Sequence, residues 1–206
     1  MTERPFFHDG MRQLQDRYDG RRVADAIADN RVHAEFWDSE RALIAASPFF
    51  FLATAHAGHV DCTIKSGDPG FVQVIGANVL EFPDYDGNSM YRSLGNMLRS
   101  PRVGMLFVRF DGKSLRMRAS GVASMHDDAG ILARHHGAKR VVRVDCDEIF
   151  PNCPRYLPDM SGASDAGGSI YTPRPGHEPP PPEWKLRDYI RPLLPADDPA
   201  REDGAK

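Results

Sequence analysis

The sequence predicts a mainly β protein with flanking helices, in which six or seven antiparallel strands form a closed or partly closed barrel. Between residues 48 and 150 the apolar runs are short, often alternate with polar residues, and are separated by Gly-containing turns, as hairpin strands are. Apolar residues at helical spacing are found mainly before residue 47 and in short segments at the corners. This order of elements favours an antiparallel barrel over a doubly wound α/β sheet.

The composition is that of one domain. A chain of 206 residues with 41% hydrophobic and 27% charged residues can bury one sizeable core but is short for two. The formal net charge of −3 and the pI near 6.2 exclude a general attraction to nucleic acid or to an anionic membrane. Three cysteines without a CxxC pair indicate neither a disulfide framework nor a zinc site, so a reducing cytoplasm is expected. No apolar run reaches the roughly 20 residues that a membrane span needs.

Residues 1–47 are predicted to be helical and to pack on the barrel. Apolar residues recur at helical spacing in three stretches, Gly10–Tyr18, Arg22–Asp29 and Ala34–Ala46. The third stretch carries large apolar residues, including Phe36, that need a partner. We therefore expect this helix to dock on the sheet.

Two hairpins are predicted next. The run FFFLATAH is a core strand, and after the Ala57-Gly58 turn the return strand His59–Lys65 alternates apolar and polar residues. A second hairpin joins Phe71–Ile75 to Val79–Phe82 across a Gly-Ala-Asn turn. Both hairpins are antiparallel.

The stretch 82–108 predicts a corner suited to an anion. Pro83 ends the preceding strand, and turn-forming residues up to Asn88 lead into a helix that begins near Met90. A buried strand, Arg102–Phe110, follows directly. The unpaired N–H groups and the positive dipole end of such a helix attract phosphate or carboxylate. Water can satisfy the same N–H groups, so this feature alone does not decide for a ligand.

Three further elements complete the predicted barrel. The Asp111-Gly112 turn precedes a half-exposed strand over Leu115–Gly121. A short helix over Asp127–His135 and a last strand over Val141–Ile149 follow.

Residues 161–206 form a tail of different character. The tail is rich in Gly, Ser and Pro up to Pro182, which disfavours regular structure, and then regains apolar residues from Trp184 at near-helical spacing. We expect an extended tail with a short helix. Its apolar residues should pack either on its own core or on a second subunit.

Five blocks of the sequence resemble the pyridoxamine 5′-phosphate oxidase-like family of flavin-binding split barrels. In chain order the blocks read DCTIKSGDPGFV, FPDYDGNSMYRSLGNM, SPRVGMLFVRF, SLRMRASGVASM and NCPRYLP. The resemblance covers roughly residues 6–160 and implies a six-stranded antiparallel split β-barrel, which we place at residues 48–160. With the predicted helical segment 1–47 packed on the barrel and the tail 161–206, the chain is expected to form one domain. The resemblance further implies a homodimer that binds FMN in a groove at the subunit interface and acts on a small molecule.

The same resemblance implies a set of cofactor-binding residues. Lys65 and Ser66 fall at a strand end where the family sets a basic or hydroxyl group on the flavin phosphate or ring edge. The next strand end presents backbone to the isoalloxazine, and the following helix start meets the phosphate. An arginine of the last block either reaches the phosphate, in its own or the partner subunit, or is a plain surface residue. The implied residues are Lys65, Ser66, Phe82, Pro83, Asn88, Ser89, Met90, Arg92 and Arg155.

The chain departs from better-known members of the family in two places. Ser89-Met90 stand where those relatives carry basic residues, and Arg92 comes only slightly later. The segment WKLRDYIRPLLP lacks the Arg and His pattern of the pyridoxamine phosphate oxidases, so vitamin B6 oxidation is not predicted. The first hypothesis is an FMN-dependent oxidoreductase with an unknown substrate. The alternative is a non-enzymatic module that binds flavin, deazaflavin or haem; no catalytic side chain and no metal site is predicted.

Overall fold

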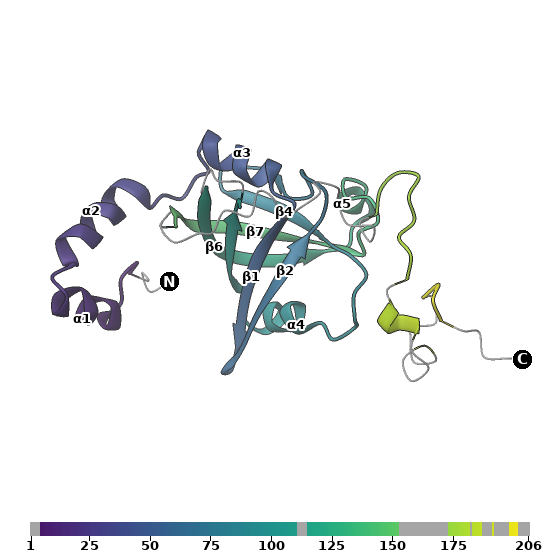
Figure 1. Ribbon diagram of the computed structural model, residues 1–206, viewed down its shortest axis with the longest axis horizontal. Helices are drawn as coiled ribbons and strands as arrows, with labels where there is room; N and C mark the ends of the chain where they lie inside the picture. Colours follow the sequence, from purple (N-terminus) through teal and green to yellow (C-terminus); the bar gives the residue numbers. More distant parts are fainter. Residues whose placement is uncertain are drawn as a thin grey trace, which may run out of the picture.

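The computed structural model describes residues 5–110, 115–152, 173–181, 183–186, 191 and 198–201. Its centre is a seven-stranded antiparallel sheet with the strand order β2-β1-β5-β6-β7-β4-β3 (Figure 1). The predicted mainly β architecture with antiparallel strands and flanking helices is confirmed. The strands are β1 Phe49–His56, β2 His59–Ser66, β3 Gln73–Val74, β4 Val79–Asp84, β5 Arg102–Val108, β6 Arg116–His126 and β7 Arg140–Pro151.

Two features of the sheet differ from the six-stranded split barrel that the family resemblance implies. The sheet is open, because β2 and β3 stand at its two ends and do not pair with each other. A seventh strand is present because Gln73 and Val74 pair with Glu81 and Leu80 of β4.

The helices lie at the periphery of the sheet. Helix α3 packs beside β3, as expected for the third helical stretch, and α4 lies against β1 and β2. Helices α1 and α2 extend away from the sheet at the end opposite the C-terminal segment (Figure 1). The helices are α1 Asp9–Arg17, α2 Arg21–Arg31, α3 Asp38–Ala46, α4 Arg92–Arg99, α5 Ala129–Leu132 and the 3₁₀ helix η1 Glu183–Leu186. Within the described ranges no helix is long and apolar enough to cross a membrane.

Helix α3 begins four residues later than predicted. The Phe36 N–H donates to the Ala77 carbonyl at 2.8 Å, which holds the chain extended before the helix. The Trp37 N–H then donates to the Glu40 carboxylate at 3.0 Å and so satisfies a donor at the helix start. These tertiary contacts therefore move the start of the helix from Ala34, where apolar periodicity predicts it, to Asp38.

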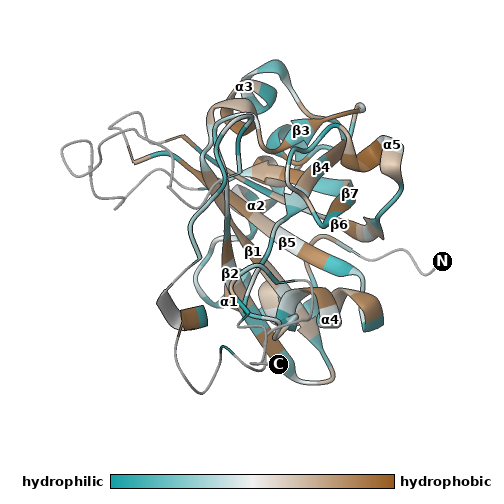
Figure 2. Cartoon of the chain, turned by 90° about the vertical axis from the view of Figure 1, so that its right-hand side faces the viewer, coloured by the Kyte–Doolittle hydropathy of each residue, from teal (hydrophilic) through white to brown (hydrophobic). Residues whose placement is uncertain are grey.

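Three phenylalanines from three strands form the centre of the core. The ring of Phe50 lies 5.0 Å from that of Phe82 and 5.1 Å from that of Phe107, and all three are fully buried. Leu43 and Ile44 of α3 cover this core from one side. Hydrophobic colour accordingly runs along the strands in Figure 2.

Strands β6 and β7 are longer than predicted because Gly121 does not end β6. The ladder continues through a bulge between Ser120 and Gly121. A Cβ atom on Gly121 would lie 2.2 Å from the Asp145 carbonyl oxygen, so only glycine allows this close approach. The helix predicted over Asp127–His135 is shorter in the structure, where α5 covers Ala129–Leu132.

The alternation predicted for β2 is present, and its apolar side faces outward. Val60 and Ile64 are 73% and 56% exposed, whereas Asp61, Thr63 and Lys65 are half-buried. Helix α4 lies beside this strand on the polar side. An edge strand whose apolar face is left uncovered is a candidate contact surface.

Candidate functional site

A cavity of about 210 Å³ lies between the edge strand β2, the connection from β4 to α4, and the start of β7. Residues 84–94 form most of its wall, and Asp61, Thr63 and Lys65 line it from β2. Lys139 and Arg140 complete the lining from the start of β7. The cavity therefore lies at the corner that the sequence singles out.

The connection from β4 to α4 is shaped by two residues in the left-handed region. Ser89 and Tyr91 have φ values of 60° and 50°, which L-residues adopt rarely. These values delay the start of α4 to Arg92, so the predicted helix start at Met90 is wrong. Asn88 accordingly does not cap the helix: its Oδ1 accepts a hydrogen bond from the Met90 N–H at 3.0 Å within the turn.

The strand before this connection continues past Pro83, contrary to the prediction that Pro83 ends it. Pro83 pairs with Val141 and Asp84 with Arg140 of β7. Strand β3 pairs with the other edge of β4 only at Leu80 and Glu81. Pro83 lies beyond this pairing, so its missing N–H is tolerated. This extension places Asp84 in the cavity wall.

Four cationic and three carboxylate side chains line the cavity, which gives the lining a net charge of +1. Asp84 is shared between two of the cations. Its carboxylate lies 3.3 Å from Lys65 Nζ and 3.5 Å from Arg140 Nη1. Lys65 and Asp84 are mostly buried, with side-chain exposures of 21% and 11%.

The other two cations each have a carboxylate partner as well. Arg92 Nε lies 3.1 Å from Asp61 Oδ1, and Lys139 Nζ lies 2.8 Å from Asp86 Oδ1. Burial raises the pKa of Asp86, but the hydrogen bonds from Lys139 and Lys185 outweigh this effect and hold that pKa below its usual range. The cavity therefore holds ordered charge of both signs with an excess of cations.

Five of the residues implied by the family resemblance meet at this cavity, namely Lys65, Asn88, Ser89, Met90 and Arg92.

Four of the implied residues do not line the cavity or cannot be placed. Ser66 follows Lys65 in the strand, so it points to the opposite face and is exposed. Phe82 lies wholly within the core, and Pro83 is buried but is not part of the lining. Arg155 lies outside the described residues.

Lys139 and Arg140 are site residues that the sequence analysis missed. They precede the predicted last strand, Val141–Ile149, and carry no motif of their own. Adjacent cations directly before a strand were the available signal. Backbone pairing brings them to the cavity, because the Lys139 N–H donates to the Asp84 carbonyl at 3.0 Å.

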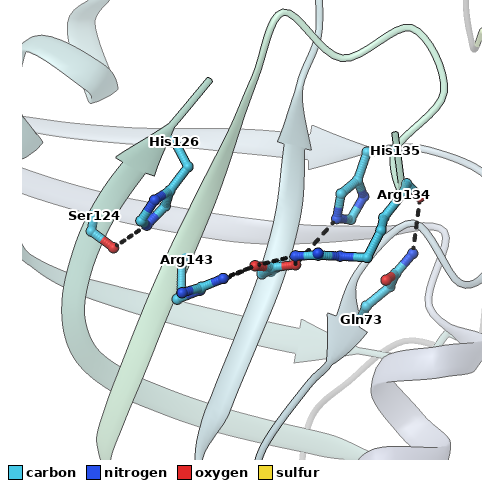
Figure 3. Close-up of polar contacts among 7 residues, drawn as sticks. Gln73, Ser124, His126, Arg134, His135 and Arg143 are labelled. Atoms are coloured by element: carbon cyan, nitrogen blue, oxygen red, sulfur yellow. Dashed lines mark hydrogen bonds and ion pairs between the residues drawn. The ribbon is translucent and has the colours of Figure 1, made fainter. Parts of the chain in front are cut away.

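A buried ion network on β4 holds the loop that leads into these two cations. Glu81 is fully buried and accepts hydrogen bonds from Arg134 and from Arg143 (Figure 3). Burial raises the pKa of Glu81, yet the hydrogen bonds from both arginines keep it below its usual range. His135 Nε2 lies 3.6 Å from the same carboxylate. Arg134 and His135 thus anchor the α5–β7 loop to β4 just before Lys139.

The C-terminal segment reaches the rim of the same cavity. Arg174 forms two hydrogen bonds with Asp68 in the β2–β3 loop. Lys185, only 4% exposed, donates to Asp86 on the cavity wall and to Asp198 at 2.7 Å. The described parts of the tail therefore contact other segments of the same chain, whereas Tyr189, Ile190 and Leu193 lie outside the described residues.

A second, more open hollow adjoins the cavity. It shares Tyr91, Leu94, Lys139 and Arg140 with the first and extends along α4 towards His126. The Arg140 guanidinium lies over the Tyr91 ring at 5.1 Å from its centroid. A ligand larger than the first cavity can extend past this pair.

No protein-family model and no curated protein sequence matches the chain. Among solved structures, it resembles a putative pyridoxamine 5′-phosphate oxidase from Lactobacillus delbrueckii, with a TM-score of 0.47 and 19% identity over 57% of this chain and 95% of the other. HupZ from Group A Streptococcus gives a TM-score of 0.45 and 16% identity over 56% and 93%. An FMN-binding protein from Syntrophomonas wolfei gives 0.45 and 13% over 68% and 97%. At such values the function has to be argued from the residues of this chain.

Proposed function

We propose that this chain binds FMN at the cavity and acts as a flavin-dependent oxidoreductase on a small molecule. The observation that carries the proposal is the convergence of Lys65, Arg92, Lys139 and Arg140 on one cavity beside the start of α4. Cations and helix N–H groups are the donors that phosphate recognition uses.

The residues present fit a phosphate group. The lining has one cation more than it has carboxylates, and the helix start adds N–H groups that have no partner within the helix. Lys65 and Arg92 would hold the phosphate, while Arg140 keeps the Asp84 carboxylate paired. When bound, the flavin supplies the hydride chemistry, while the protein orients the substrate and excludes water.

The size of the cavity supports a site made by two chains. Small-molecule sites usually measure about 300 to 1,000 Å³, and this cavity of about 210 Å³ takes only part of a flavin. We infer that the ring lies in a groove completed by a second copy. The six-stranded split barrel implied by the sequence resemblance, with β3 as an addition at its edge, belongs to the same proposal.

A continuous apolar surface supports the homodimer. We call it the outer face, and it consists of side chains of β2, β1 and β5 that point away from the core. Cross-strand pairs such as Phe51 with Ile64 and Ala53 with Gly104 place them side by side. The outer face comprises Phe51, Ala53, Ala55, Val60, Cys62, Ile64, Gly104 and Leu106.

The excess of cations in the lining favours a ligand with a phosphate group, as FMN has. Haem iron is held by histidine, cysteine, methionine or tyrosine. Tyr85 and Tyr91 line the cavity and His126 lines the adjoining hollow, so haem stays the alternative that the absorption spectrum tests. A deazaflavin remains a variant of the proposal, because a phosphate site does not distinguish it from FMN.

The proposal is tested with the purified full chain. An absorption spectrum identifies flavin, deazaflavin or haem as purified, and fluorescence titration then compares FMN with riboflavin, which lacks the phosphate. We expect FMN to bind at least about tenfold more tightly than riboflavin. Equal affinity for both would refute the phosphate site. Oxidation of NADH or NADPH by the loaded protein separates an enzyme from a carrier.

A further inference from the structure

Helices α1 and α2 form a projecting arm, defined as residues 9–31. Two ion pairs join its helices and turn: Arg12 lies 2.5 Å from Asp25, and Arg21 lies 2.5 Å from Asp16. The arm extends from one end of the sheet, away from the other helices (Figure 1).

The arm is polar inside and apolar outside. Arg12 and Gln15, which are hydrogen-bonded to each other, form the partly buried side of α1. Met11, Leu14 and Tyr18 recur at spacings of three and four, so they form a stripe on one helix face. Their exposures are 42%, 55% and 72%, and Ile27 of α2 is 54% exposed. We call these four exposed apolar residues, three on one face of α1 and one on α2, the arm stripe.

Such an arm is not expected to hold its shape alone. Isolated helices shorter than about 12 to 15 residues are marginal in water, and α1 and α2 have 9 and 11 residues. No described side chain in either helix is buried. Helix α3 also has 9 residues, but it buries Leu43 and Ile44 against the sheet. The arm stripe therefore requires a covering surface.

We propose that the arm of each subunit packs on the second copy of this chain and covers its arm stripe there. The inference rests on the homodimer of the proposed function and adds a second contact to it.

Arg118 and Phe150 link the outer face to Phe6, which lies just before the arm. One row of cross-strand neighbours runs from the edge strand to the arm, in the order Ile64, Phe51, Leu106, Arg118, Phe150. The ring of Phe6, just before α1, then packs edge-on against Phe150 at 5.3 Å. A copy seated on the outer face is thus brought alongside the arm.

The outer face alone has fewer residues than one side of a stable dimer interface. Stable interfaces commonly involve about 20 to 30 residues on each side. The outer face supplies eight. Two arms in a symmetric dimer add two equivalent contacts, because a two-fold interface uses every patch twice.

The test uses the full chain with the substitution Ile27→Glu. Glutamate is a better helix former than isoleucine and stands four residues before Arg31, so the helix itself is not weakened. The matched control is Ile75→Glu, because Ile75 is 43% exposed beside β3, at the sheet edge furthest from β2. Sedimentation velocity over a concentration series measures the dimer dissociation constant, and circular dichroism checks helix content.

We expect Ile27→Glu to raise the dimer dissociation constant at least about tenfold, because each arm loses a buried isoleucine. Ile75→Glu should leave it unchanged. Hydrogen exchange of residues 9–31 should slow as the wild-type concentration rises through the dissociation constant.

The two proposals fail in different ways. A wild-type dimer whose affinity is unchanged by Ile27→Glu overturns the arm contact and leaves the dimer in place. A wild-type monomer overturns both the dimer and the arm contact, while FMN titration still tests the phosphate site. A rate of hydrogen exchange in the arm that does not depend on protein concentration also counts against the arm contact.

Discussion

The ammonium group of Lys65 lies 3.3 Å from the carboxylate of Asp84 and links the ends of β2 and β4 across the cavity. Under the proposed function, an incoming phosphate meets a lysine that is already paired. Arg140 shares the same carboxylate, so Asp84 keeps a partner when Lys65 turns to a ligand. The pair holds the cation in place before the ligand arrives, which reduces the ordering cost of binding.

Lys65→Ala should weaken FMN binding about tenfold to a hundredfold. It removes a charge-assisted hydrogen bond worth roughly 1.5 to 3 kcal/mol. Stability should fall by less than about 1 kcal/mol, because Asp84 retains Arg140. FMN titration and urea unfolding measure the two effects. Arg99→Ala, an exposed cation at the far end of α4, serves as the control, and equal loss in both variants would contradict the assignment.

The variants Asn88→Asp and Asn88→Ala should separate the effect of turn geometry on stability and FMN binding from the effect of charge. Aspartate keeps the acceptor for the Met90 N–H, so the fold should be unchanged, but its negative charge should weaken FMN binding about tenfold. Alanine removes the acceptor of an exposed turn at a cost of about 0.5 kcal/mol and has a smaller effect on binding. Thermal unfolding with and without FMN measures both variants. If aspartate binds FMN as tightly as asparagine, the anion does not lie near residue 88.

His135 should make the protein less stable as pH falls below neutrality. Burial lowers the pKa of His135, and Glu81 opposes this only in part. Below about pH 6.5, the ordinary pKa of histidine, the unfolded chain binds a proton that the folded chain does not bind. The free energy of unfolding should therefore fall from about pH 6.5 down to the lowered pKa. Urea unfolding at several pH values should show a shallower fall for His135→Gln, and an identical slope would argue against the assignment.

Glu81→Gln should destabilise the fold by about 2 to 3 kcal/mol. The variant leaves Arg134 and Arg143 without the buried carboxylate that they share, although both can still reach solvent. Because the pKa of Glu81 is lowered, its stabilisation is present above about pH 4.5 and is lost as pH falls through the folded value. The free energy of unfolding of Glu81→Gln should therefore lack this loss as the pH falls. Asp147→Asn, which breaks the exposed pair with Arg102, should cost less than about 1 kcal/mol as the matched control.

Much of the strand content could be predicted from the sequence, because it depends on neighbours a few residues apart. The alternation in β2, the apolar run of β1 and the turn at Gly58 reflect side-chain period and backbone preference. The polar corner at 84–92 was also visible, since its turn residues are adjacent. Residue spacing did not specify which face of β2 is covered. That depends on α4, which packs beside it from about 30 residues further along the chain.

The sequence by itself predicted the antiparallel strands and the polar corner at 84–92, and the family resemblance added Lys65 to it. Only the tertiary structure decided that Lys139 and Arg140 join that corner, because the register of β4 against β7 pairs Asp84 with Arg140. The same register buries Glu81 between arginines more than 50 residues away. Local propensity extends over a few residues, whereas strand register and burial are set by contacts between distant segments, and those contacts decide which charges meet.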